Sequence, residues 1–130
     1  MTQILVTNSE GRPGVGKTAE MLAAGHGGLD AIEAGIRLVE ADTAIRTVGR
    51  GGWPNLLGEV ELDAAIIDGN TFRSGAVGAL KGYLHPISIA RAVLERLPHE
   101  MLVGEGAARF AHETGAQTAD NLIPDSERVW

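Results

Sequence analysis

The sequence contains no cysteine. This excludes a disulfide framework, a thiolate metal site and a cysteine nucleophile. Aromatic residues make up only 4% of the chain, so a core has to be built from Ala, Val, Ile and Leu. No apolar run approaches membrane-spanning length, and residues 1–3 lead straight into a strand pattern rather than a signal peptide. We therefore expect a cytoplasmic protein that has no membrane partner.

Positive charge is also scarce. Eleven Lys and Arg face 17 Asp and Glu, which gives a net charge of −6. Such a balance argues against a general affinity for nucleic acid. The four histidines lack the spacing of a zinc site, so we expect neither a metal nor a cofactor. With 130 residues, 44% of them apolar, the chain is long enough for one domain with a modest core.

The most conspicuous motif is GRPGVGKT at residues 11–18. It matches the P-loop pattern, in which backbone N–H groups cradle phosphates, a lysine reaches the β/γ oxygens and a hydroxyl binds Mg²⁺. The candidate phosphate-binding residues are Gly11, Gly16, Lys17 and Thr18. The motif makes a nucleotide site one possible function.

The sequence around this motif contains one feature that favours a nucleotide site and two that oppose it. The apolar run Ile4–Val6 predicts an opening strand, and a helix is expected from about Thr18 to Ala24, as a P-loop requires. However, the chain is short for an NTPase, and βαβ alternation is not evident after this unit. The alternative is a Gly-rich turn whose Lys17 merely starts a solvated helix.

The stretch Leu62–Leu80 is the predicted centre of the fold. An apolar run at Ala64–Ile67 is followed by Asp68-Gly69-Asn70 and then by a run of small residues. The Asp-Gly pair predicts a hairpin whose turn accepts positive φ. The small residues after the turn allow another backbone layer to approach closely.

The remaining elements follow from periodicity and from helix-start and loop signals. They are an amphipathic helix through Leu29, Ile32, Ile36 and Val39, a structured loop at Thr43–Leu57, a helix from Pro86 to Leu97, a strand at Met101–Val103 and a helix at Glu105–Glu113.

A family resemblance extends over most of residues 4–115 in unbroken order. The residues that carry it include GLDAIEAG (28–35), RLVE (37–40), TVG (47–49), GGWPN (51–55), ELDA (61–64), HPISIARAV (85–93) and LVGEGA (102–107). Through them the chain resembles the α-chain of threonine-type asparaginases, isoaspartyl peptidases and glycosylasparaginases, which are N-terminal-nucleophile hydrolases. This match is far more specific than the eight-residue motif near the N-terminus.

The resemblance implies an α+β protein with an αββα sandwich, made as one precursor that cuts itself into two chains. This chain would be the N-terminal product and would form about half of the sandwich with residues 1–115. Residues 116–130 would be a flexible tail that leads to the cleavage point. The partner would be the β-chain of the same precursor, in an (αβ)₂ heterotetramer.

The resemblance also implies the chemistry. The first threonine of the β-chain attacks the side-chain amide carbon of an aspartyl compound, with its own α-amine as general base. An oxyanion hole stabilises the intermediate. No catalytic residue is then expected in this chain, which contributes active-site support. The supporting residues are Thr47, whose hydroxyl can donate and accept near the nucleophile, and Gly51, Gly52 and Asn55 beside the pocket.

One departure concerns the substrate. In glycosylasparaginases a Trp in the first strand-to-helix loop touches substrate, whereas this loop reads Ser9-Glu10-Gly11-Arg12. Free asparagine and isoaspartyl dipeptides are therefore at least as favoured as glycosyl-asparagine. Two other functions stay open: a P-loop nucleotide-binding domain, and a non-catalytic remnant of the asparaginase fold that serves as an interaction module.

Overall fold

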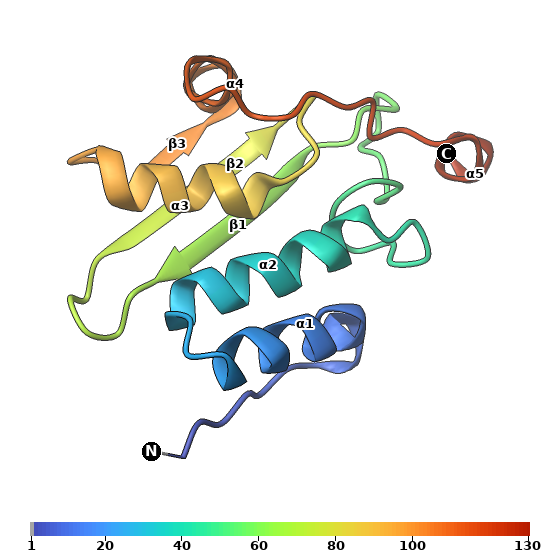
Figure 1. Ribbon diagram of the computed structural model, residues 1–130. Coiled ribbons are helices and arrows are strands. Elements are labelled where there is room, and N and C mark those ends of the chain that lie inside the picture. Colours follow the sequence, from blue (N-terminus) through green and yellow to red (C-terminus); the bar gives the residue numbers. More distant parts are fainter. Residues whose placement is uncertain (1) are drawn as a thin grey trace.

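The computed structural model describes residues 2–130, which fold into several helices and a small β-sheet (Figure 1). A 3₁₀ turn (Ser9–Gly11) is followed by α1 (Arg12–Ala23), α2 (Gly28–Ala41), β1 (Leu62–Ile67), β2 (Ser74–Leu80), α3 (Pro86–Arg96), β3 (Met101–Val103), α4 (Gly104–Glu113) and α5 (Pro124–Val129). Within residues 2–130, every helix is too short or too polar to cross a membrane. The mixture of helix and strand agrees with the predicted α+β class.

The described part of the chain forms a sheet in the order β1-β2-β3. β1 is antiparallel to β2, and β2 is parallel to β3, so that Ala65, Ala76 and Met101 lie side by side. Helix α3 connects the parallel pair, because parallel strands need a crossover rather than a tight turn. The predicted central hairpin, the third strand and the helices over residues 29–39, 86–97 and 105–113 are confirmed.

The hairpin turn differs from the prediction. The N–H of Asp68 donates to the carbonyl oxygen of Arg73 at 2.9 Å. The Asp68 carboxylate accepts from the Asn70 N–H at 3.0 Å and from the Thr71 hydroxyl at 2.8 Å. The left-handed residue is Phe72, with φ 56°, and not Gly69. The Asp68 side chain supports a longer loop, in which the positive φ falls at Phe72, two residues before β2 begins.

Helix α3 lies directly against β2, because Gly75 has no side chain. A Cβ at Gly75 would lie 2.1 Å from the carbonyl oxygen of Ala90 and 2.5 Å from the nitrogen of Leu94. The predicted close approach of a second backbone layer is therefore confirmed. The core around this contact is mainly aliphatic, in keeping with the scarcity of aromatics. Its large buried aliphatic side chains include Val77, Leu80, Ile87, Ile89 and Val93.

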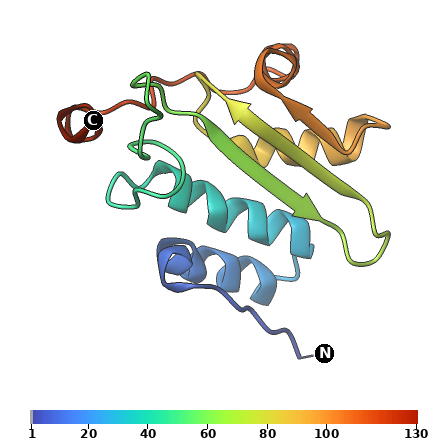
Figure 2. The same cartoon turned by 180° about the vertical axis from the view of Figure 1, so that it is seen from behind.

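The other face of the sheet is not covered by any helix within residues 2–130 (Figure 2). We call it the open sheet face: Ala65, Ile67, Ala76, Met101 and Val103. The exposed fractions of Ile67, Met101 and Val103 are 64%, 56% and 58%. Three large apolar side chains are therefore exposed on this face.

Helices α1 and α2 lie beside the sheet (Figure 1). The two helices approach each other closely at Gly14 and Gly35. A Cβ at Gly14 would lie 2.3 Å from the carbonyl oxygen of Gly35. Helix α1 begins at Arg12 rather than near Thr18, so the predicted start is wrong. Pro13 fits the first helical turn, where its missing N–H removes no hydrogen bond, and Gly14 is selected by packing rather than by a loop.

The predicted opening strand at Ile4–Val6 is not present. Ile4 and Val6 are 81% and 86% exposed, while Leu5 between them is half-buried. The alternation is typical of a strand, but a strand also needs a neighbour to complete its hydrogen bonds. Within residues 2–130 this segment has none.

Residues 116–130, expected to be a flexible tail, contact the rest of the chain in several places. Thr118 forms an isolated antiparallel bridge with Tyr83. The Asn121 amide donates to the carbonyl oxygen of Tyr83 at 2.8 Å. Ser126 is fully buried, and the Trp130 indole donates to the carbonyl oxygen of Leu56 at 3.3 Å. The polar side chains of the segment bond to backbone groups elsewhere, which its composition alone does not reveal.

Candidate functional site

Residues 46–53, which we call the Thr47 loop, follow α2 and turn back on themselves. The N–H of Trp53 donates to the carbonyl oxygen of Arg46 at 3.0 Å, and that of Gly52 to Gly49 at 3.1 Å. Gly49 and Gly51 have φ values of 64° and 84°. Glycine enters this left-handed region without strain, so the turn itself requires glycine at these positions.

The Thr47 loop is attached to the end of α2 through the backbone of Glu40. The N–H of Arg50 donates to the Glu40 carbonyl oxygen at 2.8 Å. Gly49 packs against the same group so closely that a Cβ would lie 2.1 Å from this oxygen. The position of the loop therefore depends on the position of Glu40.

Thr47 itself is exposed, and its hydroxyl donates to Glu10 Oε2 at 2.5 Å. A hydroxyl that gives its proton to a carboxylate keeps its lone pairs for other donors. The oxygen of Thr47 is therefore oriented as an acceptor, a form suited to holding an amine or ammonium group.

Glu10 also lines a hollow of about 290 Å³ between the N-terminal segment, α2, β1 and α3. Its acidic lining residues are Glu10, Glu40 and Asp63, and its apolar ones include Ile36, Val39 and Val48. Thr47 is thus connected to this hollow through Glu10. The hollow lies at the free edge of β1, on the far side from β2.

Glu40 is the most buried acid of this hollow, with 3% of the residue exposed. Its carboxylate accepts from the Ile87 N–H at 2.9 Å, in the first turn of α3, and lies 3.3 Å from Nδ1 of His85. Burial raises the pKa of the Glu40 carboxyl, although the hydrogen bonds from His85 and Ile87 oppose the rise. Glu40 therefore joins α2, α3 and the Thr47 loop.

Asp63 has a structural task at the sheet. The register between β1 and β2 shifts after Leu62, and Ala79 there has φ 48°. The Asp63 carboxylate accepts from the Ala79 N–H at 2.8 Å. It thereby satisfies a donor that the shifted ladder leaves unpaired.

The other residues predicted to support the site do not line this hollow. Gly51 and Gly52 are buried, and Gly51 bonds to the C-terminal segment rather than facing the hollow. Asn55 organises its own turn, since its side-chain oxygen accepts from the N–H groups of Leu57 (2.9 Å) and Glu59 (3.1 Å). The structure thus connects Thr47 with Glu10 and the hollow, whereas Asn55 bonds within its own turn.

Comparison with known proteins shows the family. A family model described as "Asparaginase" matches residues 12–129. The chain belongs to the asparaginase family. It is 46% identical over 111 residues to an N(4)-(beta-N-acetylglucosaminyl)-L-asparaginase from Elizabethkingia miricola, covering 85% of this chain and 32% of that protein. This match confirms the resemblance that the sequence motifs indicate.

Other relatives give the same result. A plant-type L-asparaginase from Pyrococcus abyssi is 41% identical over 102 residues, covering 78% of this chain and 33% of the relative. A rat N(4)-(beta-N-acetylglucosaminyl)-L-asparaginase is 42% identical over 108 residues, covering 83% of this chain and 31% of the relative. The chain therefore spans about a third of the length of the curated relatives that it matches.

In this member of the asparaginase family the P-loop-like residues form no phosphate cradle. Residues 12–18 lie within α1, where the backbone takes part in a helix rather than a loop. Lys17 pairs with Glu20 at 3.3 Å, and Thr18 is buried against Gly35. Gly16 faces open space, and Gly11 packs on the Thr7 side chain.

The residues that sequence reasoning missed are Glu10, Arg46 and Glu40. Glu40 has a recognisable signal, because it lies four residues after Ile36 on the apolar side of the amphipathic helix. A carboxylate on that side has to be buried, and a buried carboxylate needs partners. Glu10 and Arg46 have no such signal, because their contacts are with residues distant in the sequence.

Proposed function

We propose that this chain is the α-subunit of a self-cleaving amidohydrolase. The enzyme hydrolyses the β-amide or β-aspartyl bond of asparagine, isoaspartyl dipeptides or related compounds. Its nucleophile is the N-terminal threonine of a β-chain cut from the same precursor, and two αβ pairs form an (αβ)₂ heterotetramer. The observation that carries the proposal is the 46% identity to a glycosylasparaginase over 85% of this chain.

The open sheet face supports a missing second layer. Its apolar side chains are exposed in this chain, whereas a second sheet packed on them would bury them, as in an αββα sandwich. The chain matches only 32% of its relative from Elizabethkingia miricola, so enough sequence remains in such a protein to supply that sheet.

The free edge of β1 supports a partner chain as well. Edge strands with an apolar sequence are normally paired or covered, yet β1 has β2 on one side and the hollow on the other. A second hollow of about 140 Å³ continues under α2 toward Leu5 and Val6. We infer that strands of the β-chain fill this space and also pair with Ile4–Val6.

Thr47 has a defined part in this proposal. Its oxygen, oriented as an acceptor by the bond to Glu10, receives an N–H of the nucleophile's α-amino group. This contact holds the amine so that its lone pair can take the proton of the attacking hydroxyl. The threonine oxygen then bonds to the side-chain amide carbon, the C–N bond breaks, and ammonia or the amine leaves with the transferred proton. Water hydrolyses the resulting aspartyl-enzyme, which releases aspartate and restores the threonine hydroxyl.

The proposal is tested on the complete precursor. We expect denaturing electrophoresis to show two chains in equal amounts, and N-terminal sequencing to find threonine at the start of the second. The cleaved protein should release aspartate from asparagine, an isoaspartyl dipeptide or glycosyl-asparagine. A precursor that stays uncut and inactive under these conditions would contradict the proposal and favour a non-catalytic remnant.

Substitution of Thr47 tests its part. Thr47→Ala should lower kcat by about 10- to 100-fold, because the amine loses its orientation, whereas Thr47→Ser should retain most of the activity. Thr43→Ala, an exposed threonine in the turn after α2, is the matched control and should have wild-type kcat. Equal activity of Thr47→Ala and the control would remove Thr47 from the site.

A further inference from the structure

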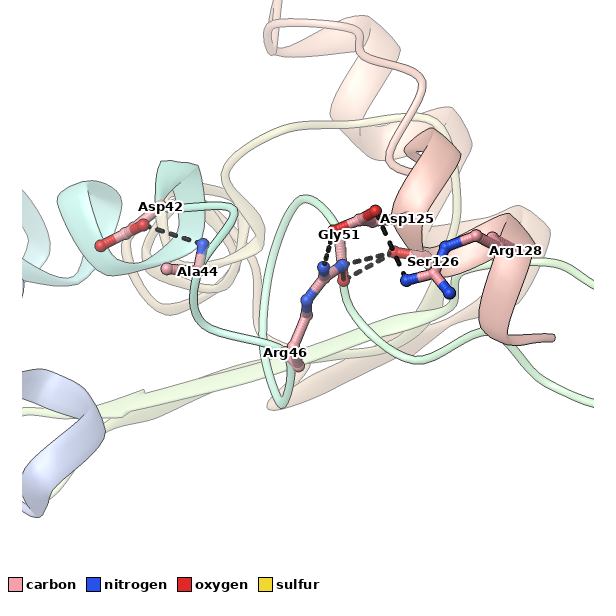
Figure 3. Close-up of polar contacts among 7 residues, drawn as sticks. All are labelled: Asp42, Ala44, Arg46, Gly51, Asp125, Ser126 and Arg128. Atoms are coloured by element: carbon pink, nitrogen blue, oxygen red, sulfur yellow. Dashed lines mark hydrogen bonds and ion pairs between the residues drawn. The ribbon is translucent and has the colours of Figure 1, made fainter.

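Arg46 directly precedes Thr47 and extends its side chain toward the C-terminal helix α5 (Figure 3). Its Nη1 donates to the carbonyl oxygen of Gly51 and to Ser126 Oγ, both at 3.1 Å. Its Nη2 donates to Asp125 Oδ2 at 2.9 Å. One guanidinium thus connects Arg46 and Gly51 of the Thr47 loop with a segment about 80 residues later.

The C-terminal segment contacts Gly51 from several sides. The N–H of Gly51 donates to the carbonyl oxygen of Asn121 at 2.8 Å, and its carbonyl oxygen accepts from the Ser126 hydroxyl at 2.8 Å. A Cβ at Gly51 would lie 2.8 Å from Cδ1 of Ile123. The backbone of the loop at Gly51 therefore cannot shift unless residues 121–126 shift with it.

The opposite side of the Thr47 loop is attached to Glu40 through Gly49 and Arg50. Thr47 lies between these two attachments, and within residues 2–130 its side chain bonds to Glu10. Its position is consequently determined by the loop backbone on both sides. Of the two attachments, the one at Arg46 is closer to Thr47 in the sequence, because Arg46 directly precedes it.

We propose that Arg46 is a positioning residue of the hydrolase site. It clamps the C-terminal segment onto the Thr47 loop and so holds the Thr47 hydroxyl where the nucleophile's amine needs it. This inference rests on the proposed function. It also assigns residues 121–126 a function in the mature enzyme: together with Arg46 they hold the backbone of the Thr47 loop in place.

The chemistry of the clamp selects arginine. The guanidinium is a planar fork with several donors in a rigid arrangement, and here it serves three acceptors at once. A lysine ammonium is a compact point charge and does not span these acceptors. The ion pair with Asp125 lies near the surface, since the Asp125 side chain is 62% exposed. Its charge therefore contributes little, and the clamp depends mainly on the geometry of the hydrogen bonds.

The test uses the complete, self-cleaved protein with Arg46→Ala, Arg46→Lys and Ser126→Ala. Arg46→Ala should lower kcat on the order of 10-fold or more, because displaced catalytic groups cost rate steeply, while KM stays within about twofold of wild type. The kcat of Arg46→Lys should lie between those of wild type and Arg46→Ala. Ser126→Ala should lose less kcat than Arg46→Ala does. Guanidinium chloride at low concentration should restore part of the kcat of Arg46→Ala.

The matched control is Arg128→Ala. Arg128 lies on α5, the helix that contains Asp125 and Ser126. It also pairs with Asp125, but at 3.8 Å and with a 74% exposed side chain. It should have wild-type kcat and show no response to guanidinium. Wild-type kcat in Arg46→Ala, or a loss that guanidinium leaves unchanged while KM rises equally, would overturn the clamp.

Amide hydrogen exchange separates this inference from the proposed function. In Arg46→Ala the amides of Gly51 and Gly52 should exchange about tenfold or more faster than in wild type, and in Arg128→Ala they should not. This result is independent of any catalysis. An inactive wild-type protein would refute the proposed function, whereas unchanged exchange in Arg46→Ala would refute the clamp.

Discussion

Two glycine-rich stretches of this molecule, residues 11–18 and the Thr47 loop, use glycine for different physical reasons. Gly14 lies in the regular helix α1 and is needed because a side chain would meet the backbone of Gly35. Gly49 and Gly51 are needed because their φ values are 64° and 84°. The first stretch requires small size at Gly14, whereas the second requires backbone freedom at both glycines and small size as well at Gly49.

The two stretches also differ in what stabilises them. Lys17 in the first pairs with Glu20, three residues away on the same helix. The Thr47 loop depends on Glu40 and on the C-terminal segment, for example through Ser126, which lies 75 residues from Gly51. A motif that looks specific can therefore be a plain helix, while a loop without periodicity can be determined by distant contacts.

The largest expected effect is that of Gly49→Ala. The new Cβ combines left-handed strain with overlap against the Glu40 carbonyl oxygen, and we expect the free energy of unfolding to fall by about 3 kcal/mol. Urea denaturation of the complete protein measures this change. Gly25→Ala is the control, because Gly25 has φ 85° but open space around it; it should cost only about 1–2 kcal/mol. Equal losses would contradict a packing role for Gly49.

The next effect concerns the helix crossing. Gly14→Ala should lower the free energy of unfolding by about 1 kcal/mol, because overlap with Gly35 exceeds the gain in helix propensity. Gly16→Ala on the same helix meets nothing within 4 Å and should raise stability by about 0.5–1 kcal/mol. Thermal midpoints of the two variants should thus move in opposite directions. A gain in both would show that α1 and α2 are not tightly packed.

Much of the fold could be predicted from the sequence, since the burial of a helix or hairpin is largely decided by its own pattern. The apolar positions of α2 and the small residue at Gly75 are examples. The opening strand is wrong because the strand-like pattern at Ile4–Val6 has no partner within residues 2–130. The predicted start of α1 is wrong because Pro13 and Gly14, judged from the sequence alone, suggest a loop.

Less of the candidate site could be predicted. The family resemblance selected Thr47, but its partner Glu10 lies 37 residues away and belongs to no local motif. The bond between Arg46 and Ser126 spans 80 residues. Such contacts depend on how loops are folded in three dimensions, and a single sequence contains no period or spacing that encodes them.

The pH dependence of stability can distinguish the two glycine-rich stretches, because the Thr47 loop is attached to Glu40, whose carboxylate is buried. Burial raises the pKa of Glu40 in the folded protein. The folded state therefore binds this proton more tightly than the unfolded state does. The resulting stabilisation is complete below about pH 4.3, where an unperturbed glutamate ionises, and is lost as the pH rises through the raised pKa.

Glu40→Gln removes this titration and keeps an acceptor for the Ile87 N–H. We expect the stability of wild type relative to Glu40→Gln to fall as the pH rises from about 4 to 7. Glu20→Gln, whose side chain is 70% exposed, is the control and should follow the wild type. A constant difference between wild type and Glu40→Gln across this range would show that burial does not raise the pKa of Glu40.

The smallest expected effect is that of Lys17→Ala. The pair between Lys17 and Glu20 is exposed, with side-chain exposures of 41% and 70%, so its loss should change the free energy of unfolding by no more than about 0.5 kcal/mol. Since residues 12–18 are helical, calorimetric titration with MgATP should give no binding signal for wild type or variant. Tight MgATP binding that disappears in Lys17→Ala would mean that residues 11–18 can leave the helix and form a phosphate loop. The absence of any change is therefore the informative result, because it separates a glycine pattern chosen for helix packing from one chosen for phosphate.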